Sequence, residues 1–341
     1  MKKRVTIKDV AAKSGVTYQT VSKVINGRAQ VMPETEARIL AASQALGYKP
    51  NHSARSLRAQ RSQMIGYSWV PTGRNQTNHI LDMFLTSMVE EAEAAGYHLL
   101  PFPYREGDDQ VSAYRELIDS GRVDGFVLSS VNYSDPRIQF LLENQFPFVA
   151  FGHCEPEDNF PFVDVNGELG MRLATEHLLQ LGHRRIAALA WPEDSRVGNE
   201  RLQGYTAAMR AAGAPIDPAW VARGEGTFEF GLASASAWFA LPESSRPTGV
   251  VALNDTMAIG AMHAAQNRGE LPGRQFSVVG FDDSPMAEYL WPPLTSISQP
   301  IRLAGRKCVE MLVSLLTGQA MAERRVLLQP ELVVRQSSGA A

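Results

Sequence analysis

Residues 6–61 decide how this chain is organised, and they read TIKDVAAKSGVTYQTVSKVINGRAQVMPETEARILAASQALGYKPNHSARSLRAQR. Three short helices followed by a basic linker are predicted. Thr6 can cap the first helix, with Asp9 as the acidic member of a capping box, and Gly15 can close that helix in a tight turn. Thr17 can then cap a second helix. Helix, short glycine-containing turn and helix form the helix-turn-helix pattern.

The second predicted helix, residues 18–25, has an apolar face of Val21, Val24 and Ile25 and an opposite polar face. The major groove of B-DNA admits one helix, and the start of the second helix reads bases in this motif. The residues expected to read bases are Tyr18, Gln19 and Lys23. Those better placed for phosphates are Thr6, Ser22, Asn26 and Arg28, and the cap Thr17 completes the DNA-binding set. The alternative is a small helical bundle with a solvated polar face.

The charge distribution favours DNA binding. Residues 1–62 contain twelve Lys or Arg against three acidic residues, a net charge of +9, whereas the remaining 279 residues carry 21 basic and 33 acidic side chains, a net charge of −12. Positive charge concentrated at one end of a nearly neutral chain is typical of a segment that binds phosphate groups.

Three runs carry a resemblance to the LacI/GalR family of bacterial repressors: DVAAKSGVTYQTVSKVINGR (9–28), PETEARILAASQALGYKPN (33–51) and ARSLR (54–58). Met32 departs from the Ser or Thr cap that would be usual, although Pro33 suits the first helical position. The resemblance implies a hinge helix over residues 51–59 that forms on DNA, with Leu57 wedged into the minor groove. Its DNA-binding residues would be Ala54, Arg55, Leu57 and Arg58. A plain basic linker is the alternative.

Length and composition agree with a regulator of this kind. A chain of 341 residues with 44% hydrophobic residues suits a small head plus one or two α/β domains. Its cysteines, Cys154 and Cys308, have no metal-ligand or redox spacing, which predicts packing roles in a reducing cytosol. No run of about 18 apolar residues spans a membrane. The basic start lacks the apolar core of a signal peptide, so we expect a cytoplasmic, nucleoid-associated protein.

From residue 64 onward, strand and helix patterns alternate, first over 64–151 and again over 169–281. This rhythm predicts two doubly wound parallel-sheet subdomains with a ligand cleft between them. The resemblance implies a periplasmic-binding-protein-like effector domain after an all-α helix-turn-helix head. The expected boundaries are 1–50 for the head, 51–62 for the hinge and 63–341 for the effector and dimerisation domain. Within that domain the N-subdomain would be 63–163 and 293–325, and the C-subdomain 164–292 and 326–341.

Three further motifs match the family in order: RLQGY from residue 201, LNDTMAIGAM from 253 to 262, and VVGFDD ending at 283. The resemblance implies effector contacts from Arg201, Asn254 and Asp282, whose side chains can accept from and donate to sugar hydroxyls. A purely structural ion pair is the alternative. The other candidates are the aromatic residues Phe228, Trp69 and Trp191, for which core packing is the alternative, and the polar residues Gln299, Arg196 and His79.

No catalytic motif, metal site or cofactor site is expected. Ser-His-Asp order, G-x-S-x-G and H-E-x-x-H are absent, and the adjacent Asp282 and Asp283 would point to opposite faces of a strand. We therefore expect a repressor of carbohydrate-use genes, not an enzyme, that binds a near-palindromic operator as a homodimer and takes a sugar effector. Two alternatives stay open: a purine-type corepressor, or a small-molecule binding protein without a DNA role.

Overall fold

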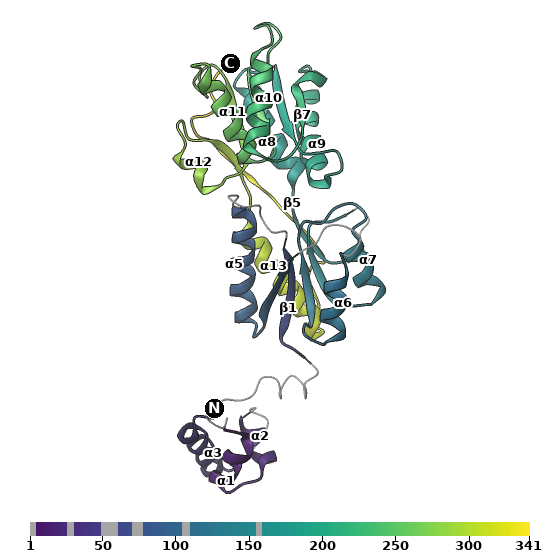
Figure 1. Cartoon of the computed structure of the whole chain (residues 1–341), viewed down its shortest axis with the longest axis vertical. Helices are drawn as coiled ribbons and strands as arrows, with labels where there is room; N and C mark the ends of the chain where they lie inside the picture. Colours follow the sequence, from purple (N-terminus) through teal and green to yellow (C-terminus); the bar gives the residue numbers. More distant parts are fainter. Residues whose placement is uncertain (1–4, 26–30, 49–60, 70–77, 104–109, 155–158) are drawn as a thin grey trace. The chain divides into compact units, whose positions relative to one another are not determined.

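The computed structural model describes residues 5–25, 31–48, 61–69, 78–103, 110–154 and 159–341. The chain divides into two compact units, Met1–Ser62 and Gln63–Ala341 (Figure 1). We call the first unit the head and describe the second as two lobes, each built on its own sheet.

The described residues of the head form three helices, α1 (Ile7–Ser14), α2 (Tyr18–Ile25) and α3 (Pro33–Leu46). Gly15 and Gly47 adopt the left-handed conformation at φ 66° and 62°, which ends α1 and α3. The apolar faces meet in one small core of buried side chains, namely Val10, Ala11, Val21, Val24, Ile39 and Ala42. The predicted helices and their glycine stops are therefore confirmed.

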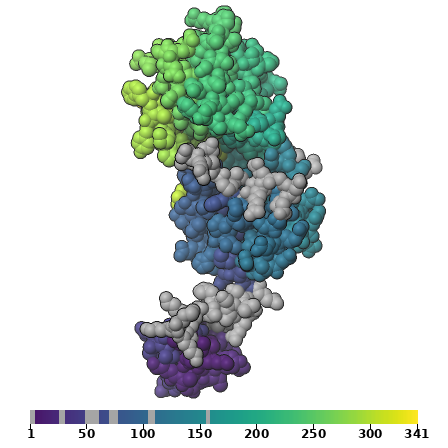
Figure 2. Space-filling view, in the orientation of Figure 1, coloured from purple at the N-terminus to yellow at the C-terminus, as the bar shows by residue number. Residues whose placement is uncertain are grey.

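The first lobe is a parallel sheet in the order β11-β5-β4-β3-β1-β2. Alternate residues of its strands face two separate cores: Val127 packs beneath α5 and α13, and Phe126 and Leu128 beneath α6 and α7 (Figure 1). Little of the yellow α13 is seen in Figure 2, because blue and teal residues cover it. Its elements are β1 (Met64–Trp69), α5 (His79–Ala94), β2 (His98–Pro103), α6 (Ser112–Asp119), β3 (Gly125–Leu128), α7 (Pro136–Glu143), β4 (Phe148–Phe151), β5 (Phe162–Val165), α13 (Ile301–Thr317) and β11 (Arg325–Leu328).

The second lobe has the order β12-β10-β9-β8-β6-β7, in which only β12 is antiparallel to its neighbour. Glycine lets its helices approach closely: a Cβ at Gly204 of α9 would lie 2.0 Å from the Glu168 carbonyl oxygen of α8. Its elements are α8 (Gly167–Gln180), β6 (Ile186–Ala190), α9 (Arg196–Ala211), η1 (Pro218–Trp220), β7 (Val221–Arg223), α10 (Phe228–Phe239), β8 (Gly249–Ala252), α11 (Asp255–Asn267), β9 (Ser277–Asp282), α12 (Pro285–Tyr289), β10 (Thr295–Ser298) and β12 (Glu331–Val333).

The chain passes between the sheets three times, after β5, β10 and β11. The predicted subdomain boundaries need correction here. Residues 295–298 pair with β9 in the second sheet, so the second crossing comes after 298 and not at 293. Residues 325–328 pair with β5 in the first sheet, so the third crossing comes after 328 and not at 325. The first comes after 165 and not at 163, because β5, a strand missing from the sequence prediction, completes the first sheet.

Candidate functional site

The recognition face of α2 is open to solvent. Tyr18 is 44% exposed, Gln19 and Lys23 are exposed, and Ser22 is half-buried, whereas Val21 and Val24 of the same helix are buried. The predicted division of α2 into an apolar and a polar face is therefore confirmed. Base reading by these polar side chains stays a prediction.

Two of the predicted DNA-binding residues, Thr6 and Thr17, form hydrogen bonds that cap helices of the head. The Thr6 hydroxyl and N–H both donate to Asp9 Oδ2 at 2.7 Å, which forms the predicted capping box. Thr17 Oγ1 accepts the Thr20 N–H at 3.2 Å and so caps α2. The remaining DNA-binding candidates lie outside the described residues, as does the predicted hinge helix; they are Asn26, Arg28, Ala54, Arg55, Leu57 and Arg58.

Arg201 is the centre of a cluster of predicted effector contacts in the second lobe. Its side chain is buried, its guanidinium carbon lies 3.7 Å from the centroid of Phe281 and 5.0 Å from that of Trp191, and Nη1 donates to the Leu253 carbonyl at 2.5 Å. Asp282 Oδ1 is 3.7 Å from Nη1. Burial lowers the Arg201 pKa. The Arg201 guanidinium thus lies against the rings of Phe281 and Trp191. The Asp282 carboxylate is its neighbour, but at 3.7 Å it is too far away for a hydrogen bond.

Asp282 ends β9 in a backbone conformation that L-residues rarely adopt, with φ 113°. Gln299 Nε2 donates to Asp282 Oδ1 at 2.7 Å. Burial raises the Asp282 pKa to about 7, and the Arg201 guanidinium opposes this shift. The carboxyl group therefore sits near its midpoint of ionisation at neutral pH.

The loop after Asp282 is held by residues that the sequence reasoning did not single out. Buried Asp255 accepts the Ser284 N–H at 2.7 Å and the Ser296 hydroxyl at 2.5 Å. Asp283 pairs with Arg335 Nη2 at 2.7 Å, and both aspartates line one cavity. The strand alternation that predicted opposite faces does not apply, because β9 ends at Asp282 and the two residues have φ 113° and 48°. The sequence indicates a turn here, through serine or glycine flanked by acidic residues. It does not identify the residues that hold this turn in place.

Asn254 is the N-cap of α11 and is fully engaged within the lobe. Its Oδ1 accepts the Met257 N–H at 2.8 Å and its Nδ2 donates to the Gly226 carbonyl at 2.9 Å. A Cβ at Gly226 would lie 2.6 Å from Asn254 Nδ2 and 2.7 Å from Trp191 Nε1. The structure therefore brings Asn254 and Trp191 together at the carboxyl ends of the strands, beside Arg201.

A cavity of about 320 Å³ extends this site toward the first lobe. His79 and Met83 of α5 line one side of it, and Asp282, Gln299 and Arg335 are among the residues on the other side. His79 Nε2 is buried there and has no hydrogen-bond partner among the described residues. Of the predicted effector contacts, His79, Asp282 and Gln299 thus share one cavity.

Arg196, at the start of α9, links the two lobes. Its Nη2 donates to Asp164 Oδ2 at 3.0 Å in the first lobe, while Nη1 donates to Glu200 Oε2 at 2.9 Å and lies 3.2 Å from His153 Nε2. The Arg196 N–H also donates to Asn132 Oδ1 at 2.9 Å. Sequence reasoning placed Arg196 beside the cleft but missed its partners, because they come from distant strands and loops.

Three residues of this cluster are of types that can bind a metal ion, and their ligand atoms are close together. Those of His153, Asp164 and Glu200 lie within 4.8 Å of one another. The Arg196 guanidinium contacts all three groups. A positive charge therefore already fills the position that a cation would take.

Two predicted aromatic contacts lie apart from the Arg201 cluster. The Phe228 ring packs edge-on against His263, with centroids 5.1 Å apart, between α10 and α11. Trp69 is 37% exposed at the end of β1. Within the part of the chain that the structure describes, the rings that contact Arg201 are those of Trp191 and Phe281, and neither Phe228 nor Trp69 is among them.

A helix-turn-helix head with an open recognition face, joined in one chain to a two-lobed ligand domain with a polar cleft, defines a ligand-controlled DNA-binding regulator of transcription. Two family models match the chain: "Bacterial regulatory proteins, lacI family" over residues 6–51, and "Periplasmic binding protein-like domain" over residues 175–338.

Relatives match over nearly the whole length. The HTH-type transcriptional regulator CelR of Thermobifida fusca is 34% identical over 344 residues, covering 98% of this chain and 99% of the relative. The HTH-type transcriptional repressor PurR of Haemophilus influenzae is 30% identical over 336 residues, covering 97% and 98%. The chain belongs to the LacI family of bacterial transcriptional regulators, and these relatives are regulators and not enzymes.

Solved structures agree. A regulatory protein of the LacI family from Chloroflexus aggregans is 56% identical with a TM-score of 0.78, covering 82% of this chain and 99% of that chain. A CelR–cellobiose complex is 32% identical with a TM-score of 0.74, covering 98% and 100%. The lac repressor dimer bound to operator and the anti-inducer ONPF is 29% identical with a TM-score of 0.87, covering 99% and 100%. No helix in the described ranges is long and apolar enough to cross a membrane.

Proposed function

We propose that this chain is a repressor of carbohydrate-use genes that binds a near-palindromic operator as a homodimer and is controlled by a sugar in the cleft between its lobes. The observation that carries the proposal is the buried Arg201 beside Asp282, with aromatic faces behind it and a cavity of about 320 Å³ in front. Operator binding places the protein in the cytoplasm, at the nucleoid. The effector contacts would be Arg201, Asn254, Asp282, Trp191, Gln299, Arg196 and His79.

The chemistry of the cleft suits a neutral polyol. Arg201 and Asp282 form a donor and an acceptor whose separation of 3.7 Å leaves a hydroxyl group room to bridge them. Trp191, beside them, can stack on the C–H face of a sugar ring. The CelR relative forms a complex with cellobiose, which supports a disaccharide as the first probe.

A purine corepressor is the second candidate, since a PurR is also a relative. The unpartnered Nε2 of His79 in the cavity is the observation that favours it, because a ring nitrogen or carbonyl could meet it there. With a purine corepressor the effect of the ligand on DNA binding is reversed, so that ligand promotes DNA binding.

The dimer is supported by an apolar surface on the second lobe. Met286, Tyr289 and Trp291 are 57%, 77% and 81% exposed within one short stretch around α12. Exposed apolar side chains gathered in this way are typical of a protein interface. One helix-turn-helix also buries too little surface to be specific alone. A second copy of the chain is therefore the partner that we propose for this surface.

The proposed mechanism is a population shift. Effector closes the cleft and favours one arrangement of the two subunits, and operator favours another. The two ligands then weaken each other reciprocally, by a coupling free energy of about 1 to 3 kcal/mol. Leu57 and its neighbours would act as the minor-groove wedge in the operator-bound form.

Thermal unfolding of the full chain against mono- and disaccharides and purines tests the ligand class, because a ligand that binds only the folded state raises its stability. We expect a rise with one sugar that is lost in Asp282→Ala and kept in Asp119→Ala, a matched change of an exposed aspartate in the first lobe. A rise with purines alone would favour the corepressor. Unchanged DNA retention after removal of residues 1–62 would contradict the DNA-binding role.

A further inference from the structure

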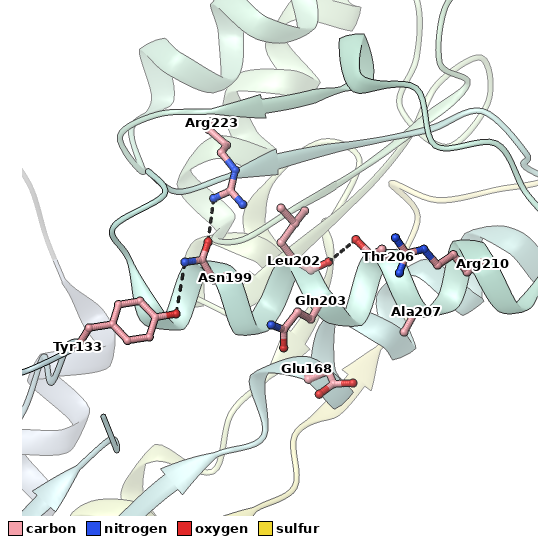
Figure 3. Close-up of a pocket in the computed structure, with 9 residues that line it drawn as sticks. All are labelled: Tyr133, Glu168, Asn199, Leu202, Gln203, Thr206, Ala207, Arg210 and Arg223. Carbon is pink, nitrogen blue, oxygen red and sulfur yellow. Dashed lines mark hydrogen bonds between the residues drawn. The ribbon is translucent and has the colours of Figure 1, made fainter. Parts of the chain in front are cut away.

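A second hollow, of about 530 Å³, follows the side of α9 (Figure 3). We call it the α9 groove. Its floor is formed by residues three or four apart, so it runs along three turns of one helix face. The floor residues are Asn199, Leu202, Gln203, Thr206, Ala207 and Arg210. The eleven steps from Asn199 to Arg210, at 1.5 Å each, give a length of about 16 Å, enough for a ligand of two or three sugar-sized rings.

Neighbouring elements make this helix face concave. Glu168 of α8 lies beside Gln203 because Gly204 lets α8 approach the α9 backbone (Figure 3). Arg223, at the end of β7, extends its guanidinium toward Asn199 from the opposite side (Figure 3). Tyr133 of the first lobe closes one end, with its hydroxyl 3.4 Å from Asn199 Nδ2.

The groove carries two positive charges that no carboxylate neutralises within the described ranges. Arg223 Nη1 donates only to neutral acceptors, the Trp191 carbonyl at 3.1 Å and Asn199 Oδ1 at 3.0 Å. Arg210 is exposed and forms none of the ion pairs found between described residues. Outside the head the chain is strongly acidic, with a net charge of −12. Two unpaired arginines in one hollow of such a surface favour an anionic ligand.

The rest of the groove offers groups that suit hydroxyls. Gln203 provides a donor and an acceptor, and Glu168 provides an acceptor. The Thr206 hydroxyl donates its hydrogen to the Leu202 carbonyl at 3.0 Å, so its lone pairs are left to accept. Leu202 and Ala207 add a small apolar floor between these polar groups.

We propose that the α9 groove is a second ligand site, separate from the cleft at Asp282, which takes a hydroxylated anion. The anionic group lies at Arg210, at one end of the groove, the hydroxyls face Glu168, Gln203 and Thr206, and Arg223, at the Asn199 end, donates to a distal hydroxyl. A sugar phosphate and a sugar acid share this chemistry.

Isothermal titration of the full chain with glucose 6-phosphate, glucuronate, glucose and inorganic phosphate tests the site, both in the unmodified chain and in Asp282→Asn, which lacks the acceptor proposed for the cleft. We expect binding of glucose 6-phosphate, glucuronate or both, which identifies the phosphate or the carboxylate as the source. Arg210→Ala should weaken it about tenfold, as expected for loss of a charge-assisted contact, and Arg223→Ala, which removes a contact to a hydroxyl, should weaken it less. Arg274→Ala removes an equal charge from an exposed loop and should change the affinity less than twofold.

Three results would overturn the proposal. They are no binding of either sugar anion, equal weakening in Arg274→Ala and Arg210→Ala, or inorganic phosphate binding as tightly as glucose 6-phosphate. Binding seen in the unmodified chain but absent in Asp282→Asn would assign the anion to the cleft instead. Because the proposed sugar effector is tested through the loss of its binding in Asp282→Ala, the two proposals fail independently.

Discussion

Sugar binding in the cleft should weaken as the pH falls from 8 to 6, because Asp282 takes up a proton in that range. Its pKa is raised to about 7 by burial. A sugar hydroxyl that donates to the carboxylate binds only the ionised form, so the apparent Kd is multiplied by 1 + 10^(pKa − pH). This factor is about 1.1 at pH 8, about 2 at pH 7 and about 11 at pH 6. The expected loss is about tenfold, or roughly 1.4 kcal/mol.

The assay is titration of the full chain with cellobiose, or with the sugar that thermal unfolding identifies, at pH 6, 7 and 8 and constant ionic strength. Below pH 6 a second group interferes, because burial raises the pKa of Asp255 to about 6 and its carboxylate holds the loop after Asp282. Asp282→Asn should bind weakly at every pH with a flat profile, and Asp119→Asn should keep the tenfold slope. A flat profile in the unmodified protein would refute the assignment of Asp282 as the acceptor of a ligand hydroxyl.

Three further predictions concern the head and the lobes. Gln19→Ala should weaken binding to the cognate operator by about 1–3 kcal/mol without altering non-specific binding, measured by fluorescence anisotropy on specific and random duplexes. Arg196→Gln leaves Asp164 and Glu200 without their cation, and the free energy of unfolding in urea should fall by about 2–4 kcal/mol. Gly204→Ala places a Cβ about 2.0 Å from a backbone oxygen of α8 and should cost at least about 2 kcal/mol in the same assay, whereas the neighbouring Gln203→Ala should change stability by under about 0.5 kcal/mol.

The elements that could be predicted are those whose patterns are local. The helices of the head could be predicted because the cap Thr6, the glycine stops and the apolar spacing of α2 each depend on residues that are only a few positions apart. The alternation of strands and helices likewise fixed two parallel sheets. β5 was not predicted because it is only four residues long and follows an irregular stretch, so the alternation typical of a strand is hardly visible in its sequence. The second and third crossings were misplaced because strand pairing, which decides them, joins residues far apart: β10 with β9, and β11 with β5.

The functional site likewise divides into residues that could be predicted from the sequence and residues that could not. The family motifs led to Arg201, Asn254 and Asp282; the structure places Asn254 and Asp282 at the ends of the neighbouring strands β8 and β9, and Arg201 of α9 lies beside Asp282. Phe228 was predicted as an aromatic effector contact, yet its ring packs against His263, because a residue at the first turn of a helix can face the adjacent helix as readily as the strand ends. Asp164 and His153 were not predicted, because only the folded sheet brings β4 and β5 opposite the start of α9.

The placement of Asp282 explains why the cleft depends on more of the chain than its contact residues. A carboxylate with φ 113° and a raised pKa is disfavoured both in its backbone and in its charge, and it persists only because other groups hold it. Asp255 fixes the loop through the Ser284 N–H, and the Asp283–Arg335 pair ties it to the segment after β12. That segment follows the third crossing, so Arg335 connects the loop after Asp282 to the crossing strands. We propose that this connection couples ligand affinity to the arrangement of the lobes, as reciprocal control by effector and operator would require.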